Sequence, residues 1–98
     1  MRISVPHHTT REEAKQKIEQ RLTSLQGQYG HYANDIDKTW EGDRLVFNVK
    51  AKGMTGSGWL EITDSEVIVE GKLPLMARPF ESRIKSAIER EAESMFRG

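Results

Sequence analysis

The histidines are the first side chains to consider for chemistry, because they could ligate a metal or move protons. The chain has three, His7, His8 and His31. Zinc ligands must converge at about 2 Å from the ion, whereas neighbours in extended chain, such as His7 and His8, point to opposite sides. We therefore expect surface or capping histidines and predict no metal site.

Two carboxylates, Asp35 and Asp37, stand in a segment from Asp35 to Glu41 that alternates like an edge strand. Their side chains would share one strand face about 6.5–7 Å apart, since a strand rises ~3.3 Å per residue. Paired carboxylates at such a spacing hydrolyse glycosides. Two acids on an outer strand are more simply explained as solvated surface, so an enzyme acting through this pair ranks third among our functional hypotheses.

The glycine-rich connection from Lys52 to Gly58 could be a phosphate-binding loop or could hold a nucleophilic serine. A phosphate-binding loop needs Gly-Lys followed by Ser or Thr and then a helix, and a nucleophilic Ser57 would need a turn from strand to helix. The connection instead lies between two segments that read as strands. We expect a mobile hairpin loop with no catalytic residue and no cofactor site. The preferred hypotheses are therefore non-enzymatic, and an enzyme stays third.

Length and charge limit the classes of protein that fit. The 98 residues suffice for a single domain, residues 1–98, with one core. The formal net charge is +0 and no basic stripe is present, which disfavours nucleic acid as a partner. The chain has no cysteine and no apolar run near the ~20 residues of a membrane span. We expect a cytoplasmic protein.

The region from Trp40 to Lys72 holds the strongest alternation of apolar and polar residues, and it predicts three consecutive antiparallel strands. A short strand from Arg2 to Val5 precedes them, closed by Pro6, and the edge strand from Asp35 to Glu41 joins them through a tight turn. The sequence thus predicts five strands in one sheet.

Two amphipathic helices complete the prediction. The first begins after Thr9 and Thr10, each followed three residues later by a glutamate as in a capping box. We expect it to end at Gly27, with residues 28–34 as a loop. The second opens at Pro79. Its apolar stripe comprises Phe80, Ile84, Ala87, Ile88, Ala92, Met95 and Phe96. The expected fold is α+β, in the order β-α-β-β-β-β-α, with a twisted, mostly antiparallel sheet and both helices packed on one face.

Strand alternation also predicts which face of the sheet the helices cover. The helix-facing set is Leu45, Phe47, Val49, Leu60, Ile62, Val67 and Val69. Val46, Trp59 and Ile68 would then point outward and, together with Met54, form a candidate interaction surface. Two alternatives stay open: one strand is shifted in register, or the stems of Lys and Glu side chains cover the patch.

The order of short motifs resembles a known family. They are Val5-Pro6-His7, Glu13-Ala14 with Ile18, Tyr29-Gly30, Trp40-Glu41-Gly42-Asp43 followed by Phe47, Leu73-Pro74, and a last helix with Phe80, Ile84, Ile88 and Phe96. Over nearly the full chain this resembles the polyhydroxyalkanoic acid system family, small bacterial proteins linked to polyester-granule gene regions. No catalytic residue is carried over from it.

The resemblance implies an accessory, non-enzymatic role in polyhydroxyalkanoate storage. Under the first hypothesis the open sheet face around Trp59 contacts a granule-associated protein, a second copy of the chain as a homodimer, or the granule surface. Under the alternative, the protein is a small binding module with a cavity between the sheet and the last helix that holds an acyl chain or similar apolar ligand.

Overall fold

A computed structural model describes residues 1–29, 35–51 and 53–97 of the chain. The strands, the long helices and the short 3-10 helix between β5 and α2 are β1 (Arg2–Pro6), α1 (Arg11–Tyr29), β2 (Asp35–Glu41), β3 (Arg44–Ala51), β4 (Met54–Ile62), β5 (Glu66–Lys72), η2 (Leu75–Phe80) and α2 (Glu81–Phe96). The predicted α+β fold and its order of elements are confirmed, and η2 is an addition to them.

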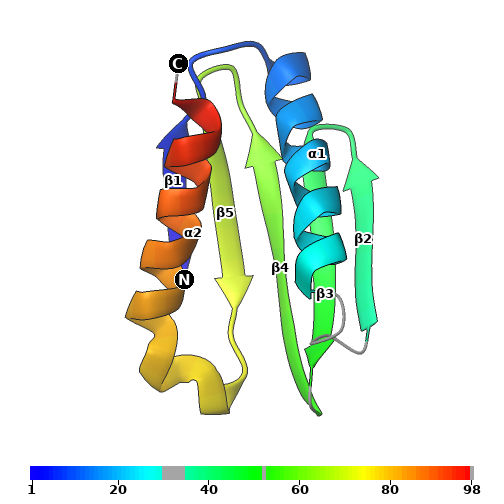
Figure 1. The fold of residues 1–98 in the computed structure, drawn as a ribbon, viewed down its shortest axis with the longest axis vertical. Helices are drawn as coiled ribbons and strands as arrows, with labels where there is room; N and C mark the ends of the chain where they lie inside the picture. Colours follow the sequence, from blue (N-terminus) through cyan, green and yellow to red (C-terminus); the bar gives the residue numbers. More distant parts are fainter. Residues whose placement is uncertain (30–34, 52, 98) are drawn as a thin grey trace.

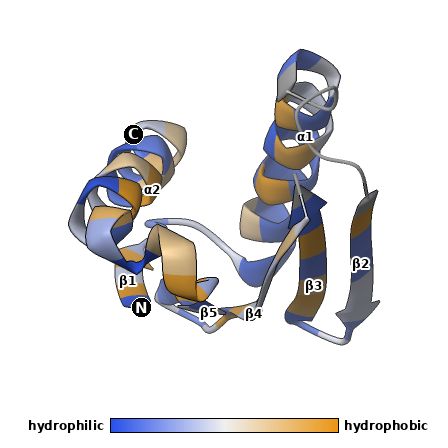
Figure 2. Cartoon of the chain, turned by 90° about the horizontal axis from the view of Figure 1, so that it is seen from below, coloured by the Kyte–Doolittle hydropathy of each residue, from blue (hydrophilic) through white to orange (hydrophobic). Residues whose placement is uncertain are grey.

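The five strands form one antiparallel sheet in the order β1-β5-β4-β3-β2. The first strand therefore lies at one edge, beside β5, although the two are far apart in the chain. Both long helices cover the same face of this sheet, as predicted (Figures 1 and 2). They lie over different halves of it, since α1 contacts β4 and α2 contacts β1.

The strand register confirms the predicted division of the sheet into two faces. Leu45 pairs with Leu60 and Leu60 with Val69, so these three residues form one row across the sheet on the helix side. Val46 pairs with Trp59 in the neighbouring row, which faces the other way. The buried hydrophobic residues lie on the helix-facing side of the sheet and on the helices: Ile3, Val5, Ala14, Ile18, Leu45, Ile62, Val67 and Phe96.

The glycine-rich segment is not the predicted loop. Apart from Lys52, which lies outside the described residues, its first member is Gly53, in a tight turn with φ +78°, and β4 begins directly afterwards at Met54. Gly58 lies within that strand, and only glycine fits at this position: a Cβ atom would lie 2.4 Å from the Glu70 carbonyl oxygen and 3.0 Å from the Phe47 ring. Glycine thus lets the Phe47 ring lie close over the backbone of the sheet.

Both helices depart from their predicted ends. α1 begins as expected, with the Thr10 hydroxyl accepting the backbone N–H of Glu13 at 3.1 Å, but it continues past Gly27 to Tyr29. The rest of the predicted loop, residues 30–34, lies outside the described residues. The predicted start of the last helix at Pro79 is wrong, since Pro79 lies inside η2 and α2 begins at Glu81. Proline has no N–H to donate, and η2 closes with 3-10 bonds such as Ala77 N–H to the Pro74 carbonyl, at 2.9 Å.

Candidate functional site

An apolar groove of about 470 Å³ lies between α1 and α2, with the sheet as its floor. It exists because the two helices cover separate halves of the sheet and leave its middle uncovered (Figure 2). The lining comprises Ile18, Arg21, Leu22 and Leu25 of α1, Phe47, Leu60, Val67 and Val69 of the sheet, and Ala87, Ile88, Glu91, Ala92, Met95 and Phe96 of α2. Its volume falls in the range of small-molecule sites in proteins, about 300–1,000 Å³.

The walls of the groove follow from the helical repeat. On α1, Ile18, Leu22 and Leu25 are four and three residues apart, so they share one face. On α2, Ile88, Ala92 and Met95 have the same spacing. In a closely packed pair of helices these two stripes would bury each other, whereas here Leu22, Leu25, Ile88 and Met95 are only half-buried. The apolar stripes that the sequence predicted as core are therefore partly the walls of a groove.

Arg21 and Glu91 are the two charged residues of the groove lining, and they form an ion pair that joins α1 to α2. Both side chains are partly exposed, 41% and 36%. The pair therefore sits at the rim of the groove, where it meets solvent. Among the described lining residues, this pair brings charged hydrogen-bonding groups to the rim beside the apolar floor.

The groove is closed at the end where the helices approach each other. Ala14 and Ile18 of α1 meet Phe96 of α2 above Ile62 and Val67 of the sheet, and these five residues form the buried core cluster. Packing at this end fixes the spacing of the helices, so the remaining walls can stay apart without collapse.

His7 belongs to this closed end; of the two predicted roles, surface or capping, the surface role is wrong for this residue. Its ring is 1% exposed and stands 6.1 Å, centroid to centroid, from that of Phe96. Nδ1 accepts the backbone N–H of Thr9 at 3.2 Å, so Nε2 carries the proton and donates to the Thr63 carbonyl at 2.8 Å. Both ring nitrogens are thus used in holding β1 and the start of α1 to the β4–β5 turn. His8 is exposed, as predicted, and His31 lies outside the described residues.

The open face of the sheet brings together three of the four residues of the predicted interaction surface. Trp59 stands directly opposite Val46, and Ile68 pairs with Glu61, two residues along β4 from Trp59. All three are half-buried, although both described long helices lie on the other face of the sheet (Figure 2). Met54 alternates with Gly56, Gly58 and Leu60, so its register position falls on the helix side of the sheet. It does not join the other three.

Arg44 limits how much of Trp59 this face offers. Its guanidinium carbon lies 4.3 Å from the centre of the Trp59 ring, and its Nη2 donates to Glu61 at 3.1 Å. The alternative left open by the sequence was that the stems of Lys and Glu side chains cover the patch. The side chain that lies over Trp59 is instead an arginine.

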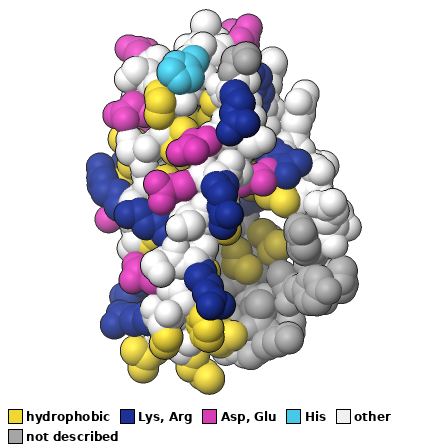
Figure 3. Space-filling model, turned by 60° about the vertical axis from the view of Figure 1, so that its left-hand side comes forward, with side chains coloured by type: hydrophobic (Ala, Val, Ile, Leu, Met, Phe, Trp, Pro, Cys, Tyr) yellow, Lys and Arg dark blue, Asp and Glu magenta, His cyan; other side chains and the backbone are white. Residues whose placement is uncertain are grey.

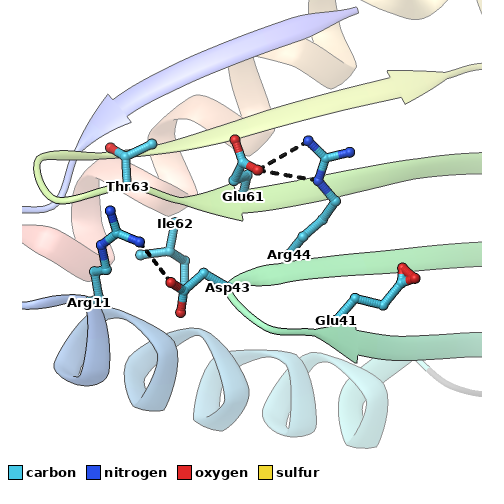
Figure 4. Close-up of a pocket in the computed structure, with 7 residues that line it drawn as sticks. All are labelled: Arg11, Glu41, Asp43, Arg44, Glu61, Ile62 and Thr63. Carbon is cyan, nitrogen blue, oxygen red and sulfur yellow. Dashed lines mark hydrogen bonds and ion pairs between the residues drawn. The ribbon is translucent and has the colours of Figure 1, made fainter.

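A second hollow, of about 420 Å³, is lined mainly by charged residues near the β2–β3 turn (Figure 4). Arg11 reaches from the start of α1 to Asp43, at 2.8 Å, and also binds Asp64, at 2.7 Å. The hydrogen bond from Arg11 holds the pKa of the Asp64 carboxyl below its ordinary value, and the same bonds raise the pKa of Arg11. Arg44 is paired with Glu61 on the other side of the hollow. These arginines and carboxylates engage each other, which ties two turns to α1.

The candidate catalytic residues are not assembled into a site. Asp35 and Asp37 lie on the edge strand β2, opposite Lys50 and Asn48, and Asp37 is exposed. Ser57 lies within β4, between Asn48 and Lys72 of the neighbouring strands, and not at a turn from strand to helix. Among the described residues, no group of three or more His, Cys, Asp or Glu side chains could hold a metal ion. Within the same residues, no helix is both long and apolar enough to span a membrane.

The fold and groove define a small α+β protein with a five-stranded antiparallel sheet, two helices on one face and an apolar hollow between them. Residues 1–96 match the model of a family described as putative polyhydroxyalkanoic acid system protein, and the chain belongs to that family. This confirms the resemblance seen in the sequence. Comparison with curated proteins and with solved structures gave no match.

Proposed function

We propose that this chain is a non-enzymatic binding protein of the polyhydroxyalkanoic acid system, and that the groove between α1 and α2 binds a hydroxyacyl chain. The proposal is supported by the description of the family, putative polyhydroxyalkanoic acid system protein, since polyhydroxyalkanoic acids are polyesters of hydroxyalkanoic acids. Such molecules combine aliphatic side chains with ester and carboxyl oxygens. The single observation that carries the proposal is an apolar groove of about 470 Å³ whose charged lining residues, among those that the structure describes, are the ion-paired Arg21 and Glu91.

The groove suits this ligand in its distribution of polarity. Leu22, Leu60 and Ile88 offer hydrocarbon on three sides, from α1, the sheet and α2. Each buried CH₂ of an acyl chain contributes roughly 0.8 kcal/mol when it leaves water. The Arg21–Glu91 pair offers hydrogen-bonding partners at the rim, where the oxygens of the ligand would lie. This is the general pattern of apolar sites with few polar groups.

The occupant we propose lies between the two helices rather than beneath the last helix alone. The sequence suggested a cavity between the sheet and the last helix; α1 supplies the opposite wall with Ile18, Leu22 and Leu25. A hydroxyacyl chain would thus contact both helices at once, and its binding would stabilise their separation.

The test is an isothermal calorimetric titration of the purified full chain with a short oligomer of 3-hydroxyoctanoic acid, which measures the affinity. Ala92→Phe places a ring in the groove and should weaken binding at least about tenfold, since the added ring occupies the volume of the ligand. Ser94→Phe adds the same ring to an exposed position of the same helix and should leave binding unchanged. Equal affinity in the two variants would rule out the groove as the site.

A second candidate function rests on the open sheet face, where Val46, Trp59 and Ile68 lie without a covering helix. Under this candidate the face contacts a granule-associated protein or a second copy of the chain, at storage granules in the cytoplasm. The adjacency of Val46 and Trp59 supports it, whereas the position of Arg44 over Trp59 reduces the apolar area on offer. We therefore rank it below the groove.

A further inference from the structure

The segment between β5 and α2 exposes large hydrophobic side chains that neither proposed site uses. Leu75 is 76% exposed, Met76 77% and Phe80 54%, and all three belong to the six residues of η2. We call Leu75, Met76 and Phe80 the apolar tip. Single exposed apolar residues are normal on protein surfaces, but three within one short turn form a patch of the kind that marks interaction sites. None of the three lines the groove.

The apolar tip lies at one end of the long axis of the molecule. η2 lies at the lower end in Figure 1, which it shares with the adjoining ends of β3 and β4, and Figure 3 shows hydrophobic side chains gathered at the lower end, with Lys and Arg side chains above and beside them. The three side chains of the apolar tip are therefore exposed at one end of the molecule and do not line the groove. An exposed apolar end suits insertion into a fluid surface better than it suits the enclosure of a small molecule.

The charges around the tip are mostly positive. Between residues 71 and 88 the chain has four basic side chains, Lys72, Arg78, Arg83 and Lys85, and a single acidic one, Glu81. The N-terminal ammonium of Met1 lies 3.4 Å from the Glu81 carboxylate and offsets its charge. Since the whole chain has a net charge of +0, this positive end is a local feature.

We propose that the apolar tip docks the protein onto an anionic phospholipid surface. Leu75, Met76 and Phe80 would enter the boundary between head groups and acyl chains, while the neighbouring Lys and Arg side chains pair with lipid phosphates. Short segments with apolar residues on one side and basic residues around them bind membranes peripherally in this way, without spanning them. The proposal goes beyond ligand binding in the groove and does not depend on it.

The experiment is flotation of the full chain with vesicles of phosphatidylcholine containing about a quarter phosphatidylglycerol. The anionic phosphatidylglycerol tests whether binding depends on negative lipid charge. The chain should float with these vesicles, float far less with vesicles of phosphatidylcholine alone, and detach at high salt. Leu75→Ser with Met76→Ser should reduce the bound fraction roughly tenfold, because insertion loses its apolar anchors. Since both residues are exposed, circular dichroism should show an unchanged fold.

Charge-reversal variants distinguish binding through the apolar tip from general electrostatic attraction of the protein to anionic lipid. Arg78→Glu should weaken flotation with anionic vesicles, whereas Lys17→Glu, which also reverses one positive charge but at an exposed position of α1, should not. Ala92→Phe should float like the wild type, so failure of the groove and failure of the tip are distinguishable. The proposal is overturned if the Leu75/Met76 variant floats like the wild type, if lipid charge has no effect, or if the variant instead dissolves a dimer of the chain.

Discussion

The guanidinium of Arg44 lies over the ring of Trp59, with its carbon 4.3 Å from the ring centre, on the sheet face that no helix covers. A cation at this distance is attracted to the ring face. The stacking engages the Trp59 ring on the open face, whereas the groove on the opposite face is an apolar hollow of about 470 Å³.

Replacing Trp59 distinguishes the two faces directly. Trp59→Ala removes the stacking with Arg44 and should lower the free energy of unfolding by ~1–2 kcal/mol, while affinity for the 3-hydroxyoctanoic acid oligomer stays within about twofold of the wild type. Chemical denaturation and calorimetry measure the two effects. A variant that remains folded but loses association with granules or with a second copy would favour the open face instead.

Gly58 should be far less tolerant of alanine than its neighbour Gly56. A Cβ at position 58 would lie 2.4 Å from the Glu70 carbonyl oxygen and 2.9 Å from the Gly71 Cα, and backbone atoms cannot move aside without separating β4 from β5. We expect Gly58→Ala to cost about 3 kcal/mol of stability, at the upper end for overpacking.

Gly56→Ala is the matched control, because the nearest atom to its Cβ would be 3.8 Å away, an ordinary contact. Urea unfolding of both variants tests the register of the central strands. Equal stability of the two would show that β4 and β5 pair differently from the structure described above.

The Arg11–Asp64 pair predicts a specific dependence on pH. The pKa of Asp64 is lowered from its ordinary value of 3.8, chiefly by the hydrogen bond from Arg11. Its contribution to stability is therefore present above pH 3.8 and is lost as the pH falls through the lowered pKa. Arg11→Gln should raise the pKa of Asp64 toward 3.8, measured by carbon NMR of its carboxyl group, with little change in stability because the pair is exposed.

Arg2→Gln provides the control for this titration. Arg2 pairs with Glu70 on another part of the surface, so its loss should leave the Asp64 titration unchanged. If Asp64 titrates identically with and without Arg11, the link from α1 to the β4–β5 turn is absent in solution.

The two faces of the sheet could be predicted from the sequence because alternation along a strand depends only on the local chain. Leu45, Leu60 and Val69 form one row as their periodicity indicated. The role of Gly58 could not be predicted in this way. Position 58 requires glycine because Phe47 on one neighbouring strand and Glu70 on the other leave no room for a side chain. A cluster of glycines indicates a loop unless those neighbours are known.

The groove was only half predictable for a similar reason. The apolar stripe containing Leu22 and that containing Ile88 were visible, but whether two stripes bury each other depends on the spacing of the helices. That spacing is fixed by distant contacts such as Ala14 with Phe96. His7 was missed because its partners, Thr63 and Phe96, are more than fifty residues away in the sequence. The signal for the apolar tip was the run of large apolar residues itself. Leu75 and Met76 were assigned to a connection, and Phe80 was assigned to the apolar stripe of α2.

Methyl NMR of the full chain during titration with a short oligomer of 3-hydroxyoctanoic acid tests the central claim most directly. The methyl groups of Leu22, Leu60 and Ile88 line the groove, whereas those of Val46 and Ile68 lie on the opposite face of the sheet. We predict saturable shifts of the three groove residues and none for the two on the open face. Shifts confined to Val46 and Ile68, or no saturable shift in the groove, would contradict the account.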